Sequence, residues 1–213
     1  CWTLLSWAVQ LRAQRRLLVL GLSVAQLLLA FFVGSRVAGS VTREAIAKHD
    51  AREHVLDVVR TPQPANPLCW NVQAVTRQRD LYRVRFGYIS LVPAWFSPEE
   101  CKMMPRGPTT APLSNRETIV NEDASAVFPL VYRASRAELA RLHREHCEAR
   151  AALRFLRAPF WMPYSEDPSR LILGDLRYDN EPELGFAELL LSRVPERCPS
   201  FVPPWTPSRE DLF

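Results

Sequence analysis

The chain has 213 residues, of which 47% are apolar and 23% are charged, and its mean hydropathy is −0.12. This balance is typical of one ordinary folded domain and excludes a disordered chain. Eighteen prolines against seven glycines exclude collagen and a fold made mostly of long uninterrupted helices. The formal net charge of +4 raises the question of nucleic-acid binding. However, Arg12, Arg15 and Arg16 lie in a segment without acidic residues, 1–34, so the rest of the chain is nearly neutral.

Residues 17–35 contain no charged side chain, and Gln26 is the only strongly polar side chain among them apart from serines. At 1.5 Å per residue, a helix of this length spans about 28 Å, which matches the hydrocarbon core of a bilayer. We therefore predict a transmembrane helix. A cleaved signal peptide is the alternative, because a basic segment precedes the apolar run and small residues follow it. The apolar region of a signal peptide is normally about 7–15 residues, which is shorter than this run.

The flanking segments predict how this helix is oriented. Residues 12–16 hold three arginines, which predicts a cytoplasmic turn by the positive-inside tendency. Residues 1–11 are uncharged, and we expect them to be the end of a truncated apolar segment that begins upstream. Residues 36–213 would then lie outside the cytoplasm, although Arg36, Arg43 and Lys48 on that side of the span oppose this orientation.

The region directly after the span, residues 36–60, is predicted to be an amphipathic helical stalk. Val37, Val41 and Ala45 recur every four residues among polar ones, which is the spacing of one helix face. The helix should end before the proline-rich TPQPANP segment, because proline interrupts helices.

Residues 61–194 are predicted to form a domain of strands and one long helix. Alternating apolar residues between Leu68 and Ser90 predict a hairpin with its turn at Asp80 or just before it. Two more strands are predicted at RLILGDLRYD and LGFAELLLSR, joined at NEPE. The proline-rich residues 195–213 are expected to be an extended tail.

The long helix is predicted over residues 135–157. Ser135 and Glu138 have the spacing of a capping box, and a leucine-rich stripe follows them at steps of three and four. The helix is expected to pack on the sheet. The predicted class is therefore α+β: an N-terminal transmembrane helix followed by a small antiparallel sheet covered by one long helix.

Two histidines on this helix, His143 and His146, are three residues apart and could both reach one metal ion. Two ligands are too few for a typical zinc site, and His146 falls on the leucine stripe, so a hydrogen-bonded core histidine is the favoured interpretation. In the hairpin, Arg83 and Arg85 alternate with aromatic residues. The arginines and the rings would then point to opposite faces, which argues against a platform for single-stranded nucleic acid and for a face toward water or lipid headgroups.

Asp175, Arg177 and Asp179 alternate in GDLRYDN and would line one face of a strand. Two carboxylates at this spacing could serve acid–base chemistry, but Arg177 between them favours the ionised form of both. A charged ladder facing a neighbouring strand is the favoured interpretation. The chain has no G-x-S-x-G, G-x-G-x-x-G or P-loop pattern, so it carries no strong catalytic motif.

Four of the five cysteines, Cys69, Cys101, Cys147 and Cys198, fall in the predicted outer domain. An even number in an oxidising compartment permits two disulfides, with three possible pairings. No C-x-x-C pattern is present, which argues against zinc binding and redox activity. We expect at least one disulfide.

Taken together, several segments resemble the C-terminal portion of a bacterial family of inner-membrane, membrane-bound metal-dependent hydrolases. They are the basic turn and span RRLLVLGLSVAQLLLAFFVG, the segment TPQPANPLCW, the tyrosine-containing hairpin, and GDLRYD followed by LGFAELLLSR. The resemblance covers most of residues 12–193. It implies a multi-span protein of the bacterial inner (cytoplasmic) membrane. Its divalent metal ion would be bound by helices upstream of this chain and not by the chain itself.

On this resemblance the chain is an accessory C-terminal domain. Its partners would be the lipid bilayer and the upstream transmembrane helices of the same protein, and not nucleic acid. Its candidate substrate-contact residues are Trp70, Asn71, Asp175 and Arg177, because they combine polar groups with predicted strands. The alternative is a non-catalytic envelope module, anchored by one span, that binds a partner or has a structural role.

Overall fold

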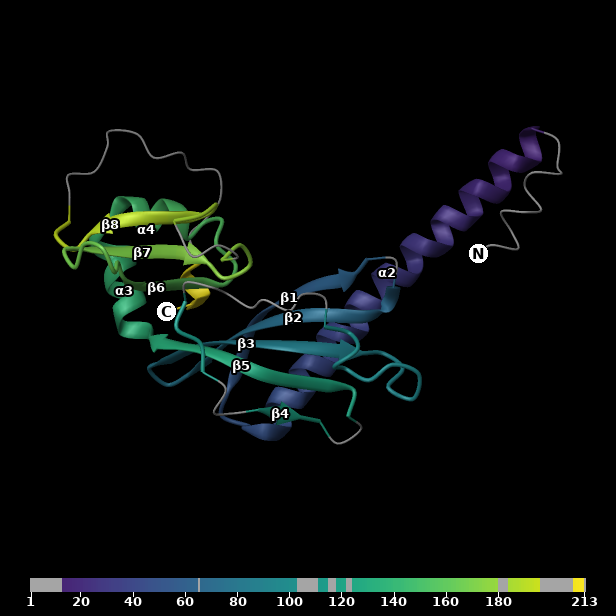
Figure 1. Ribbon diagram of the computed structural model, residues 1–213, viewed down its shortest axis with the longest axis horizontal. Helices are drawn as coiled ribbons and strands as arrows, with labels where there is room; N and C mark the ends of the chain where they lie inside the picture. The colour runs from purple at the N-terminus through teal and green to yellow at the C-terminus, as the bar shows by residue number, and fades with distance from the viewer. Residues whose placement is uncertain are drawn as a thin grey trace.

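In the computed structural model of this chain, the structure describes residues 13–64, 66–102, 111–114, 118–121, 124–179, 184–195 and 209–212. Helix α2 (Ala13–His49) projects from the rest of the molecule at its N-terminal end (Figure 1). A five-stranded antiparallel sheet lies against its other end, and a three-stranded antiparallel sheet lies beyond that. These features confirm the predicted α+β class and the order of an apolar helix followed by antiparallel strands.

The five-stranded sheet is built around the predicted hairpin. The hairpin turns at Arg79 and Asp80, and Gln78 pairs with Leu81 across it. Arg79 has a positive φ of 52°, which suits a tight two-residue turn between antiparallel strands. The strand order is β1-β2-β3-β5-β4, with β1 at His54–Gln63, β2 at Asn66–Gln78, β3 at Leu81–Ser90, β4 at Ile119–Val120 and β5 at Ala126–Ser135.

The C-terminal half of α2 packs along one face of this sheet (Figure 1). Ala38 and Ala45 are buried against apolar side chains of β1, β2 and β3. Small residues on this face let the helix backbone lie close to the strands. The predicted stalk over residues 36–60 is therefore helical only as far as His49, it packs on the sheet, and strand β1 begins at His54. Val37, placed on the apolar face of that stalk, is 41% exposed.

The second sheet is joined to the first by an aromatic cluster. The rings of Tyr82, Tyr132 and Trp161 pack together, with centroids 5.6 to 6.3 Å apart. The Tyr132 hydroxyl donates to the Trp161 carbonyl at 2.8 Å and accepts from its amide at 3.0 Å. The second sheet has the order β6-β7-β8, with β6 at Pro159–Pro163, β7 at Arg170–Asp175 and β8 at Glu188–Ser192. The two hydrogen bonds between Tyr132 and Trp161 therefore connect β5 to β6.

The single helix predicted over residues 135–157 is wrong: two shorter helices lie there, α3 (Arg136–Glu145) and α4 (Cys147–Ala152). The break falls at His146, which has an extended backbone with φ −112° and ψ 121°. Arg150 donates to the carbonyl oxygens at the end of α3, those of His143 (3.3 Å) and Arg144 (3.0 Å). These bonds satisfy acceptors that the interrupted helix leaves open.

The predicted capping box at Ser135 does not form either. No hydrogen bond joins the Ser135 side chain to the backbone of α3, and its hydroxyl donates to Asp80 at 3.1 Å. Asp80 occupies the capping position instead, because its carboxylate also accepts from the amide of Ala137 at 3.1 Å. A residue from the hairpin turn thus caps a helix whose preceding residue, Ser135, lies 55 positions later in the chain.

The described end of the predicted tail is docked rather than extended. Residues 210–212 form a short 3-10 turn, η1 (Glu210–Leu212), and Leu212 is fully buried in the core between the sheets. The carbonyl of Leu212 accepts from Arg136 at 3.3 Å. Residues 196–208 of that tail lie outside the described residues.

Candidate functional site at the end of the apolar helix

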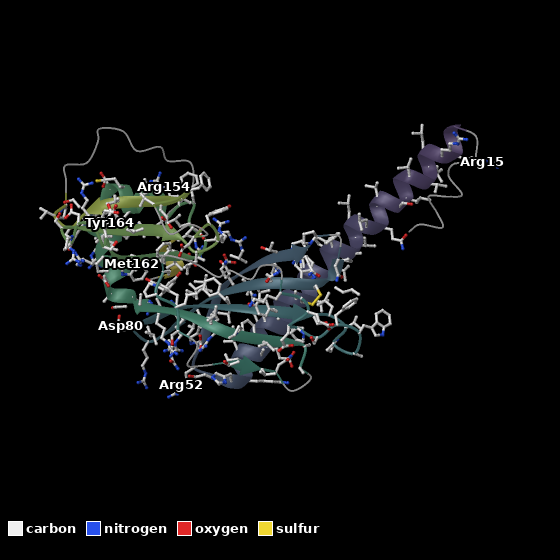
Figure 2. The ribbon with its side chains drawn as sticks, in the orientation of Figure 1. Arg15, Arg52, Asp80, Arg154, Met162 and Tyr164 are labelled. Atoms are coloured by element: carbon white, nitrogen blue, oxygen red, sulfur yellow. A yellow bond between two sulfur atoms is a disulfide. The ribbon has the colours of Figure 1, made fainter. Side chains whose placement is uncertain are left out.

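The N-terminal half of α2 is apolar and exposed. Arg15 lies at its far end, remote from both sheets (Figure 2). Leu18, Leu22 and Leu28 are each more than 60% exposed. Within the described part of the chain, α2 is the one helix long and apolar enough to cross a membrane. An apolar surface of this extent marks a site of contact with lipid or protein.

A tight joint holds the helix and the sheet together where the apolar run ends. The indole nitrogen of Trp70 donates to the Pro67 carbonyl at 2.8 Å, and its ring meets the edge of Phe31 at 6.3 Å between centroids. A Cβ atom at Gly34 would stand 2.9 Å from that same carbonyl oxygen. The start of β2 therefore lies directly on the last turn of the predicted span. Trp70, one of the candidate contact residues, is buried in this joint.

The Cys69–Cys101 disulfide fixes a loop beside this joint. The two Cα atoms are 4.9 Å apart, and Cys69 directly precedes Trp70 in β2. The Asn71 side chain donates to the Cys101 carbonyl at 3.4 Å, so this second candidate contact residue holds the same loop. Trp95, within the loop, is 73% exposed. Exposed indoles are enriched at membrane–water interfaces.

The expectation of at least one disulfide is confirmed by this bond. Cys147 is also disulfide-bonded. Cys198, the fourth candidate, lies outside the described residues.

Asp175 and Arg177 do not line a strand face. Asp175 is the last residue of β7 and Arg177 lies in the turn after it, where its guanidinium donates to the Asp175 carboxylate at 2.7 to 3.0 Å. The same carboxylate accepts from the Arg157 amide at 2.8 Å and is fully buried. Asp179 is buried separately and accepts from the Ala111 amide at 2.8 Å. The predicted charged ladder is therefore wrong: Asp175 holds the turn after β7, and Asp179 binds the backbone of a distant segment.

The two candidate metal ligands, His143 and His146, lie at the end of α3 and in the break after it. His146 is buried, as the favoured interpretation had it, but its buried Nε2 atom has no hydrogen-bond partner among the described residues. Among the residues that the structure describes, no group of three or more His, Cys, Asp or Glu side chains could hold a metal ion.

A buried ionic network at the other end of the sheet was not predicted. Glu53 accepts from Arg85 at 2.8 and 3.0 Å and from Arg83 at 3.0 Å, and Thr76 donates to it. Burial alone would raise the pKa of Glu53. The hydrogen bonds from Arg85 and Thr76 and the charges of both arginines outweigh it and lower that pKa. The alternating pattern predicts that Arg83 and Arg85 lie on a solvated face. Their buried partner, Glu53, comes from the segment before β1, and no local sequence pattern indicates this pairing.

A groove of about 490 Å³ lies where the two sheets meet. It combines two aromatic side chains with three arginines and one glutamate. These lining residues are Tyr132, Trp161, Arg133, Arg141, Arg193 and Glu138. None of the four candidate contact residues from the sequence lines it, so the structure does not bring Trp70, Asn71, Asp175 and Arg177 together in this groove.

Comparison with known proteins returns no match: no family model, curated protein or solved structure is similar to this chain. The function is therefore argued from the molecule itself.

Proposed function

We propose that this chain is a membrane-anchored module of the bacterial cell envelope, with its α+β domain seated directly on the outer surface of the inner membrane. One observation carries the proposal. Helix α2 runs without interruption from an exposed apolar half into a half that forms part of the core of the domain. The domain therefore has a fixed position relative to the span, and no flexible linker separates them.

The side of the membrane follows from charge and from cysteine chemistry. Arg12, Arg15 and Arg16 precede the span, which favours a cytoplasmic location for that end. The Cys69–Cys101 disulfide favours an oxidising compartment for the domain. Both arguments support a domain outside the cytoplasm.

The family resemblance supports a more specific proposal for a longer protein. There, this domain would be an accessory part of a metal-dependent hydrolase whose divalent metal ion is held by upstream helices. The segment TPQPANPLCW, which carries part of the resemblance, forms the joint at Gly34 and Trp70. A domain held at this position could cover a site that opens toward the membrane surface. Metal analysis of the longer protein, with hydrolysis assays before and after chelation, tests this proposal. Absence of both metal and chelator-sensitive hydrolysis would contradict it and leave the non-catalytic module.

The anchoring proposal is tested by alkaline carbonate extraction of membranes that contain the full chain. We expect the chain to stay in the membrane pellet. Leu22→Arg/Leu28→Arg places two charges in the middle of the span, at a cost of about 3 kcal/mol each, and should release the chain. The matched control Leu22→Ala/Leu28→Ala keeps the span apolar and should stay in the pellet. Release of the unmodified chain by carbonate would contradict the proposal.

A further inference from the structure

Three arginines gather where α2 leaves the predicted span. Arg36 is the first charged residue after it, and Arg43 lies two helical turns further along the same face. Gly39 lies between them, and the Arg60 side chain from β1 lies over it. A Cβ atom at Gly39 would stand only 2.7 Å from the Arg60 Nη1 atom. That nitrogen donates to the Ser35 carbonyl at 3.1 Å, so Arg60 reaches α2 between the two exposed arginines.

The positive charges of this cluster are not balanced locally. In the part of the chain that the structure describes, no carboxylate lies within ion-pair distance of Arg36 or Arg43. Asp57 attracts Arg60 but is itself bonded to Arg157 at 2.8 Å. Burial and the charges of Arg43, Arg157 and Arg36 lower the pKa of Arg60. An anion beside Arg60 would relieve this repulsion.

The cluster lies at the depth of lipid headgroups. The Arg36 guanidinium stands 5.0 Å from the centre of the Phe32 ring, so it lies next to the end of the apolar run. Arg43 is seven residues further along α2, which is about 10 Å at 1.5 Å per residue. A headgroup layer is about 5–8 Å thick on each side of the hydrocarbon core. Arg36 and Arg60 therefore lie within this layer, and Arg43 lies at its outer edge.

We propose that Arg36, Arg43 and Arg60 form a binding site for the phosphate of an anionic phospholipid in the leaflet that the domain faces. A guanidinium presents a planar fork of donors that matches the oxygens of a phosphate. This proposal rests on the proposed function, because the depth of the cluster depends on α2 spanning the membrane. A lipid site also explains why Arg36 and Arg43 follow the span on its outer side, where the positive-inside tendency disfavours arginine.

The test is a lipid titration of the full chain in dodecyl maltoside micelles, followed by native mass spectrometry. Phosphatidylglycerol, phosphatidylcholine and inorganic phosphate are added separately. Arg36→Gln/Arg43→Gln removes two exposed charges and keeps the contact of Arg60 with the helix. Each arginine near a headgroup contributes about a fivefold increase in affinity, so this variant should bind phosphatidylglycerol about 25-fold more weakly. Its binding of phosphatidylcholine should not change.

Two further variants make the result specific. Arg144→Gln removes an exposed arginine on α3, away from the cluster, and should bind like the unmodified chain. Gly39→Ala displaces the flexible end of Arg60 without removing a charge, and should weaken phosphatidylglycerol binding by up to about fivefold.

Equal affinity of the double variant and Arg144→Gln for phosphatidylglycerol would overturn the proposal. Displacement of bound phosphatidylglycerol by an equal concentration of inorganic phosphate would overturn the assignment to a lipid. The proposed function has a separate outcome, because carbonate extraction reports on the span whether or not the arginines select a lipid.

Discussion

Replacement of Glu53 by glutamine is expected to destabilise the domain strongly. The Glu53 carboxylate is the buried anion between Arg85, which is 1% exposed, and Arg83, whose side chain is 11% exposed. Glutamine keeps the shape but removes the negative charge that pairs with both arginines. Loss of one partner from a buried ion pair costs about 3–5 kcal/mol. For a chain of this size, 1 kcal/mol shifts Tm by about 2–4 °C, so a fall of about 6–20 °C is expected.

The assay is thermal unfolding of the full chain in micelles, followed by circular dichroism. Glu44→Gln is the matched control, because Glu44 forms an exposed ion pair with Lys48 on α2 at 3.0 Å. Exposed pairs of this kind contribute about 0.5 kcal/mol or less, so this variant should unfold within about 2 °C of the unmodified chain. A Glu53→Gln variant as stable as Glu44→Gln would refute the reasoning that the network is buried and coupled.

The dependence on pH provides an independent check of the same network. The pKa of Glu53 is lowered in the folded state. Its contribution to stability is therefore present above the unfolded value of about 4.5 and is lost as the pH falls through the lower, folded value. The unmodified chain should lose Tm in that acidic window, and Glu53→Gln should lose less. Parallel Tm profiles for the two proteins would contradict this assignment.

Three further predictions concern the joint and the contact between the sheets. Cys69→Ser/Cys101→Ser should lower the free energy of unfolding by about 2–4 kcal/mol in denaturant titrations. The same variant should also be cleaved faster by proteases in the loop before Cys101. An unchanged cleavage rate would argue against the disulfide fixing this loop. Tyr132→Phe leaves the buried backbone groups of Trp161 unpaired and should cost about 1–3 kcal/mol; a loss below 0.5 kcal/mol by the same titration would contradict this. Gly34→Val should separate helix and sheet at their joint and lower Tm by several degrees, whereas the exposed Gly21→Val within the span should not.

The predictions that depend on local pattern hold best. The apolar run gave α2, and the alternation around Asp80 gave the β2–β3 hairpin with the correct turn. Both features are set by side chains close together in sequence. Strand β6 was missed because its two prolines argue against a strand, although an edge strand tolerates them.

The errors share a physical cause, which is competition from distant residues. The predicted stalk does not include the contacts of Ala38 and Ala45 with the strands. This face of α2 is buried only because the sheet covers it. The capping box at Ser135 is displaced by Asp80, which the hairpin delivers from 55 residues away. Likewise, the indole nitrogen of Trp70 has its hydrogen-bond partner in the Pro67 carbonyl, a contact that the alternating pattern does not indicate. Sequence periodicity does not contain these tertiary partners.

The central claim is that the domain lies outside the cytoplasm and is anchored there by α2. Labelling with a membrane-impermeant maleimide tests it most directly, with single cysteines introduced at Ser165, an exposed residue beyond β6, and at Arg15, at the far end of α2. We predict that Ser165→Cys reacts in cells whose outer membrane has been permeabilised, and that Arg15→Cys reacts only in inverted inner-membrane vesicles. The opposite pattern, with Ser165→Cys protected in such cells and labelled in inverted vesicles, would contradict the account.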